Sequence, residues 1–183
     1  TNMTTERADI KALEAARVRL LLDYPFIGAL AMHLALCPAA ANTCPTMATD
    51  ARNIYFSPEY IEQLSSAEVA YCIAHETLHA ALGHLWRRAG RNTQRWDIAC
   101  DYAVNTLLES TRLSAPPNAL RFPDYTGLSA EEIYPLIEKN PNVETMDRHI
   151  HAGDKIDSST PYQRTQSGEE LEGLNVWDEL SEG

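Results

Sequence analysis

The sequence contains no apolar run of the 18 or so residues that a membrane-spanning helix needs. Its most apolar stretch, residues 20–36, is interrupted by Asp23, Pro25, Gly28 and His33. The first residues also lack the basic and then apolar layout of a secretory signal peptide. We therefore expect a chain without a membrane-spanning segment.

Close cysteine pairs of the C-x-x-C kind are absent, although the chain has four cysteines. Cys72 and Cys100 lie in apolar helical patterns, where a buried thiol is the usual state. Cys37 and Cys44 flank a loop and could be bridged in an oxidising compartment. Four free thiols in a cytoplasmic protein are the simpler interpretation, and we expect a cytoplasmic location.

Basic residues are scarce: the formal net charge is −11 over 183 residues. Proteins that bind nucleic acid need a basic surface, and so do those that bind anionic membranes. The charge therefore argues against both as partners. The apolar fraction of 44% suffices for one sizeable core.

The apolar periodicity predicts an α+β domain that is mostly helical, with a small β-sheet beside one central helix. The expected helices cover residues 5–22, 26–36, 57–64, 66–86, 96–108 and 129–134, and the expected strands cover residues 46–49 and 53–56. After residue 140 the composition changes, with ten acidic and three basic residues in 141–183. We therefore predict a domain over residues 1–140 and an acidic tail over 141–183, flexible over residues 152–170.

The most informative stretch is a His-Glu-x-x-His motif within the expected helix 66–86. His75 and His79 lie one turn apart on one face, so both imidazoles can bind one metal ion. Glu76 points about 100° further round, where it can reach a water on that ion but not a ligand position. Two histidines with a carboxylate are typical of a zinc site with a general base.

A catalytic zinc site needs a third protein ligand. His84 is the nearest in sequence, but on a continuous helix it would face away from the ion. Asp97, Asp101 and Asn105 recur every four residues on the next helix and share one face. Asp101 as ligand with Asn105 behind a histidine fits the spacing, and so does Asp97 with Asp101.

Three further residues are candidates for stabilising an oxyanion: Tyr102, His149 and His151. His149 could instead bind the ion from the far side. If it closed the coordination shell, the site would be structural or latent rather than catalytic.

The sequence from Pro25 to Tyr134 resembles a bacterial metallopeptidase-like domain of the zincin type, usually found before a von Willebrand factor A-like domain. The resemblance lies in residues 55–59, 74–87, 96–105 and 129–134. It implies a zincin fold in which Asp101 completes the site, and a partner domain or protein of A-type fold. Asp147-x-His149 is similar to an Asp-x-His stretch near the end of that domain.

Together, the residues predict a zinc-dependent metallopeptidase, in particular an endopeptidase acting on a protein or peptide, with one zinc ion per chain. Glu76 would take a proton from the metal-bound water and pass it to the leaving amine. The alternative is a catalytically latent or non-enzymatic module that binds metal for regulation or interaction. In a combined view, residues 145–183 mask a competent site. Residues 44–56 are the stretch that could align an extended substrate by strand addition.

Overall fold

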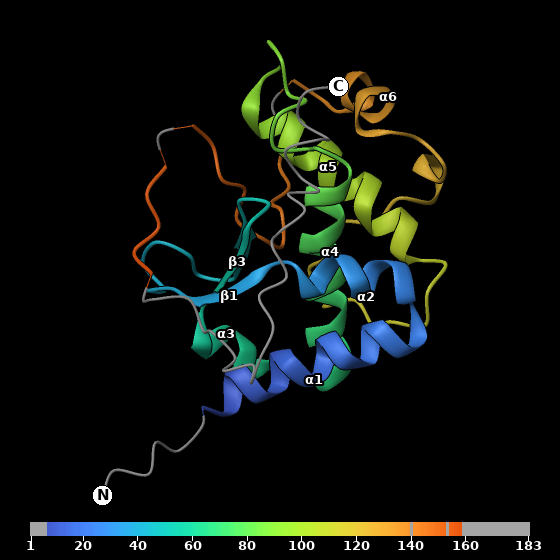
Figure 1. Ribbon diagram of the computed structural model, residues 1–183. Coiled ribbons are helices and arrows are strands. Elements are labelled where there is room, and N and C mark those ends of the chain that lie inside the picture. The colour runs from blue at the N-terminus through green and yellow to red at the C-terminus, as the bar shows by residue number, and fades with distance from the viewer. Residues whose placement is uncertain (1–6, 140, 153, 159–183) are drawn as a thin grey trace, which may run out of the picture.

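The computed structural model describes residues 7–139, 141–152 and 154–158 of the chain (Figure 1). These residues form an α+β domain, about half helical, as the sequence predicts. The elements are α1 (Ala8–Asp23), α2 (Pro25–Met32), β1 (Ala35–Pro38), β2 (Met47–Thr49), β3 (Asn53–Phe56), α3 (Pro58–Gln63), α4 (Ser66–Ala81), α5 (Thr93–Leu108) and α6 (Ala130–Ile133), with short 3₁₀ turns at Pro123–Tyr125 and Tyr134–Leu136.

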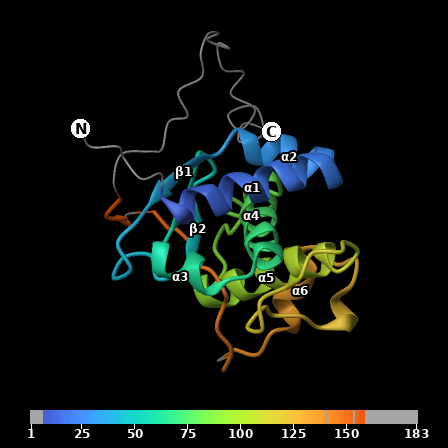
Figure 2. The same cartoon turned by 90° about the horizontal axis from the view of Figure 1, so that it is seen from below.

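Helix α4 is the centre of the fold. In both cartoon views it lies between the sheet on one side and α5 on the other, with α1 and α2 packed across it (Figures 1 and 2). Its start is fixed by a capping box: the Glu68 amide donates to the Ser65 hydroxyl oxygen, and the Glu68 carboxylate accepts from the Ser65 amide at 2.8 Å. Every residue from 69 to 80 is buried. The motif histidines therefore lie in the interior of the domain.

The three strands form one small sheet in the order β1-β3-β2. Strand β3 pairs with β1 in parallel and with β2 antiparallel, so β2 is an edge strand. The turn between β2 and β3 is closed by Asp50, whose Oδ1 accepts from the amides of Arg52 and Asn53. Both strands expected from the sequence are confirmed, and the sheet lies next to α4.

Two helix ends differ most from the prediction, and smaller shifts of up to three residues occur at other helix ends. The helix expected over residues 26–36 ends at Met32, and Ala35–Pro38 is strand β1. A short apolar run carries no period that distinguishes a buried strand from a helix, so the pattern was ambiguous there. Helix α4 ends at Ala81 rather than at residue 86, because Gly83 adopts a positive φ of 68°.

The segment after residue 140 packs on the domain as far as it is described. Met146 is 3% exposed and belongs to the main core. The predicted division at residue 140 stays a prediction. Of the stretch expected to be flexible, residues 159–170 lie outside the described residues.

Among the described residues, no helix is both long and apolar enough to cross a bilayer. All four cysteines are buried free thiols, so the alternative of a Cys37–Cys44 bridge is not what the structure shows.

Candidate metal centre

The imidazoles of His75 and His79 converge in the interior. Their Nε2 atoms lie 2.8 Å apart, and the side chains are 0% and 2% exposed. Two donor atoms at this separation can bind the same ion. The one-turn spacing of the motif therefore brings the two imidazoles together, as the sequence predicted.

The opposite nitrogen of His75 is held by Asn105. Its Nδ1 lies 2.8 Å from Asn105 Oδ1, which also accepts from the Tyr71 hydroxyl at 2.8 Å. The Asn105 amide nitrogen donates to the Leu120 carbonyl at 2.9 Å, which fixes the orientation of the amide. Since Oδ1 can only accept, His75 carries its proton on Nδ1 and presents the lone pair of Nε2 to the centre.

His84 takes the corresponding place behind His79. The end of α4 is a Schellman motif in which the Gly83 amide donates to Ala80 and the His84 amide donates to the His79 carbonyl at 3.1 Å. This turn folds the chain back, so that His84 Nδ1 lies 3.0 Å from His79 Nδ1. On a continuous helix His84 would face away from the ion, but here it contacts a motif histidine from behind.

Asp101, from α5, faces both motif histidines. Its Oδ1 lies 3.7 Å from His75 Nε2 and 3.4 Å from His79 Nε2, and the residue is 0% exposed. This oxygen makes no hydrogen bond, whereas Oδ2 accepts from the Met146 amide at 3.4 Å. The structure therefore brings together the two histidines, Asp101 and Asn105, as the spacing on two helices predicted.

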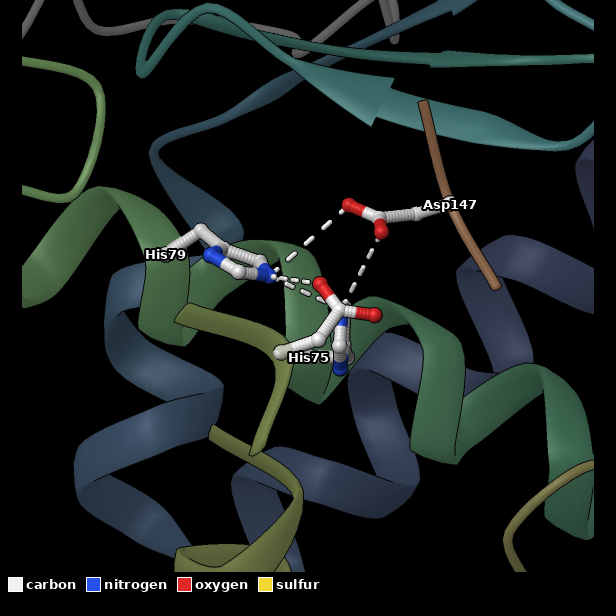
Figure 3. A group of neighbouring side chains, drawn as sticks. His75, His79 and Asp147 are labelled. Carbon is white, nitrogen blue, oxygen red and sulfur yellow. Dashed lines mark hydrogen bonds and ion pairs between the residues drawn. The ribbon is translucent and has the colours of Figure 1, made fainter. Parts of the chain in front are cut away.

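Asp147 is a fourth member that the sequence did not assign to the site. Its carboxylate oxygens lie 3.6 Å from His75 Nε2 and 3.7 Å from His79 Nε2. Figure 3 shows His75 and His79 on one helix pointing toward Asp147, whose segment lies on the side of the sheet. The only signal for it was the similarity of Asp147-x-His149 to a stretch of a related domain, because no local period connects residue 147 with the motif.

Glu76 is buried next to these residues. It is 1% exposed, and neither carboxylate oxygen has a hydrogen-bond partner. It lines a cavity together with His79 and Asp147. Burial, and then the charge of Asp147, raise the pKa of Glu76 well above its usual range in the metal-free chain.

His149 approaches the same group from the segment after residue 140. Its Nε2 lies 3.3 Å from Asp101 Oδ1 and its Nδ1 lies 3.6 Å from Asp147 Oδ1. The ring packs edge-on against His79, with 4.9 Å between the centroids. Neither of its nitrogens makes a hydrogen bond, which leaves both available to a ligand in the cavity.

The remaining candidates are placed elsewhere. Asp97 lines the cavity, but its Oδ2 pairs with His151 Nε2 at 2.9 Å, outside the group around the two motif histidines. The ring of Tyr102 packs against Tyr125, with 5.0 Å between the centroids, in the apolar cluster between α5 and α6. One residue along a helix is a rotation of about 100°, which takes Tyr102 off the face that carries Asp101.

These residues fit a divalent metal ion. One donor atom from each of His75, His79, Asp101 and Asp147 lies within 4.8 Å of the others, and all four residues are buried. For metal–ligand bonds of 2.0–2.1 Å, tetrahedral donors lie about 3.3 Å apart, close to the observed distances. Together with Glu76 the group holds three buried carboxylates, which are costly unless a cation compensates them.

The pKa shifts of the two motif histidines in the metal-free chain also support a site for a cation. Burial lowers the pKa of His75, but Asp101 and Asp147 outweigh it and raise that pKa well above the usual value. Burial and the neighbouring His75 lower the pKa of His79 well below it. The carboxylates thus favour a positive charge at His75, as they would favour a bound metal ion.

A model of one protein family matches residues 9–173, nearly the whole chain, and its description is "Putative metallopeptidase domain". The chain belongs to this family. The matched region includes α4, α5 and the segment with Asp147, so every member of the candidate metal centre lies within the match. No protein with a curated description and no solved structure matches the sequence.

Proposed function

We propose that this metallopeptidase domain is a zinc-dependent endopeptidase with one ion per chain. The observation that carries the proposal is the buried convergence of His75, His79 and Asp101 beside the unpartnered carboxylate of Glu76. Imidazole and carboxylate donors suit zinc, and three protein ligands are the usual number in catalytic zinc sites.

A zinc ion bound there supplies an acidified water and polarises a peptide carbonyl. Glu76 accepts the proton of the attacking water and delivers it to the leaving amine. Asn105 and His84 keep the two imidazoles oriented through their Nδ1 atoms.

His149 is the best placed of the three residues considered for oxyanion stabilisation. It lines the cavity beside Glu76, and both of its nitrogens are free of hydrogen bonds. His151 is engaged by Asp97, and Tyr102 does not line this cavity. We therefore propose His149 as the donor when its segment lies over the centre.

The substitution Glu76→Gln tests the proposal. The variant should bind one zinc per chain and should not hydrolyse an unfolded polypeptide, because the amide cannot accept the proton. Glu62→Gln is the matched control: it makes the same chemical change at an exposed position of α3 and should retain activity. Hydrolysis that survives in Glu76→Gln would refute the base role, and a wild-type chain that binds no transition metal would refute the whole proposal.

The second candidate function is a latent or purely structural metal module. Asp147 favours it, because a fourth protein ligand closes a tetrahedral shell and leaves no position for water. Zinc bound at one per chain without turnover in the wild type, and without turnover after Asp147→Ala, would support this alternative.

A further inference from the structure

The cavity beside the metal centre is too small for a peptide. It has a volume of about 20 Å³ and is lined by residues that include Glu76, His79 and His149. A space of this size holds about one water molecule. The donor residues are themselves buried, so an extended polypeptide has no route to them. Cleavage of a polypeptide therefore requires part of the cover to move.

The cover comes from the segment after residue 140. We define the strap as residues 146–152 and 154–158. Its Arg148 amide donates to the Met47 carbonyl at 2.8 Å, on the edge of β2 that faces away from β3. An extended peptide that adds to a sheet makes contacts of this kind. The strap thus lies on a strand of residues 44–56, the stretch that the sequence indicated for substrate alignment.

The strap also reaches the metal centre. Asp147, directly before the residue that pairs with β2, places its carboxylate near both motif histidines, and the Met146 amide donates to Asp101 Oδ2. The strap is held by an edge strand and places an oxygen donor at the candidate metal site. A bound substrate would also place a carbonyl oxygen there, so the strap takes the position expected for a substrate.

Apart from Met146 in the main core and the contact of His151 with Asp97 at 2.9 Å, the strap is held by contacts of modest strength. Ile150 and Ile156 are partly buried against a small cluster of Ala39, Cys44 and Ala48. At its far end the Ala40 amide donates to the Asp157 carbonyl at 2.9 Å, and Ala39 forms an isolated bridge with Ser158. Segments with few main-chain hydrogen bonds and half-buried apolar side chains open locally more easily than a core element does.

We propose that the edge of β2 is a binding site for an extended peptide with an acidic residue at the position of Asp147, and that the strap occupies it as an intramolecular competitor. Release of the strap exposes the Met47 carbonyl and withdraws Asp147 from the ion, which frees the fourth position. The expected effect of strap release on turnover rests on the proposed function. The expected effect on peptide binding does not.

A matched pair of variants of the full chain tests this. Arg148→Pro removes the N–H that pairs with Met47, and Arg148→Ala removes only the side chain with its ion pair to Asp154 at 3.6 Å. The difference between the two variants isolates the main-chain contact. The probe is a dye-labelled synthetic peptide with the sequence of residues 145–151, whose binding is measured by polarisation with zinc present, in a Glu76→Gln background that prevents cleavage.

The expected result follows from the population of the open state. Loss of one net hydrogen bond raises that population about fivefold, and the apparent affinity for a competing peptide rises by the same factor. Arg148→Pro should therefore bind the peptide about fivefold more tightly than Arg148→Ala. With Glu76 intact, it should hydrolyse an unfolded polypeptide about fivefold faster.

A second variant covers the case in which Arg148→Pro does not fold. Ile156→Ser weakens the packing of the strap about ten residues from the ligands and should raise peptide affinity severalfold. Val143→Ser is its control, because Val143 is 38% exposed and precedes the strap.

The outcomes separate the two proposals. Tighter peptide binding with faster turnover supports both, and tighter binding without turnover supports the strap and counts against the peptidase. Unchanged peptide affinity in the strap variants overturns the strap as competitor, whatever the turnover.

Discussion

The Nδ1 atoms of His79 and His84 lie 3.0 Å apart, so one ring must donate a proton to the lone pair of the other. His79 needs the lone pair of Nε2 for a metal ion, which puts its proton on Nδ1 and makes His84 the acceptor. Burial, and then the neighbouring His79, lower the pKa of His84 to about 2, so the acceptor stays neutral. A residue beyond the end of α4 thus fixes the tautomer of a candidate metal ligand.

The first prediction concerns this contact. His84→Leu should weaken zinc binding by about 10- to 100-fold, the usual effect of removing the hydrogen-bond partner of a liganding histidine. His84→Asn should recover most of the loss, because the amide oxygen of Asn takes the place of Nδ1 as acceptor. Competition with a chromophoric chelator measures both affinities. Equal losses in the two variants would show that His84 acts by packing alone.

The second prediction separates the two acidic ligands. Asp101→Ala should lower zinc affinity by more than about 100-fold, since α5 holds this carboxylate rigidly between both histidines. Asp147→Ala should lower it by less than about tenfold, since its place can be taken by water.

Chelator competition on the purified variants measures both zinc affinities. Similar large losses in both variants would mean that Asp147 is a permanent ligand, and the site would then be closed rather than catalytic.

The parts of the site on α4 and α5 could be predicted because each depends on a local period. The motif spacing and the capping box of Ser65 fix α4, and the step of four residues from Asp101 to Asn105 puts both on one face. Helices α4 and α5 pack together with these polar residues buried between them. In physical terms, this half of the centre is encoded within about thirty residues.

The rest of the site depends on long-range contacts that no local sequence pattern predicts. Asp147 reaches the centre from 46 residues beyond Asp101, in a segment whose sparse apolar residues are typical of a flexible tail. Its placement needs the edge of β2 as a partner, and strand pairing depends on the tertiary structure. The contact of His84 with His79 was not predicted for a related reason, since the expected helix ran through Gly83.

The third prediction tests the role of Gly83. It has a φ of 68°, and a Cβ there would meet the Trp86 ring nitrogen at 2.9 Å. Gly83→Ala should therefore lower the free energy of unfolding by about 1–2 kcal/mol and should weaken zinc binding by displacing His84. Gly90→Ala is the control: its Cβ would meet nothing within 4 Å, and the change should stay within about 0.5 kcal/mol.

Urea unfolding of the metal-free proteins gives the first quantity and chelator competition the second. A stable Gly83→Ala protein with unchanged zinc affinity would contradict the link between this turn and the ligand.

The last prediction is the pH dependence of stability without metal. In the folded chain the pKa of His84 is about 2, whereas in the unfolded chain it has the ordinary value near 6.5. Below pH 6.5 the unfolded state therefore binds a proton that the folded state does not, so the contribution of His84 to stability is present above pH 6.5 and is lost as the pH falls.

His84→Asn removes this titration. The free energies of unfolding of wild type and variant should therefore become more alike as the pH falls. The difference in their free energies of unfolding should shrink by about 2 kcal/mol between pH 8 and pH 5, from a slope of about 1.4 kcal/mol per unit below pH 6.5. Urea unfolding in the presence of a chelator measures it, and the comparison cancels the titration of groups that both proteins share. Parallel curves would mean that His84 accepts a proton in the folded state, and the assignment of His84 as the neutral acceptor for His79 would then fail.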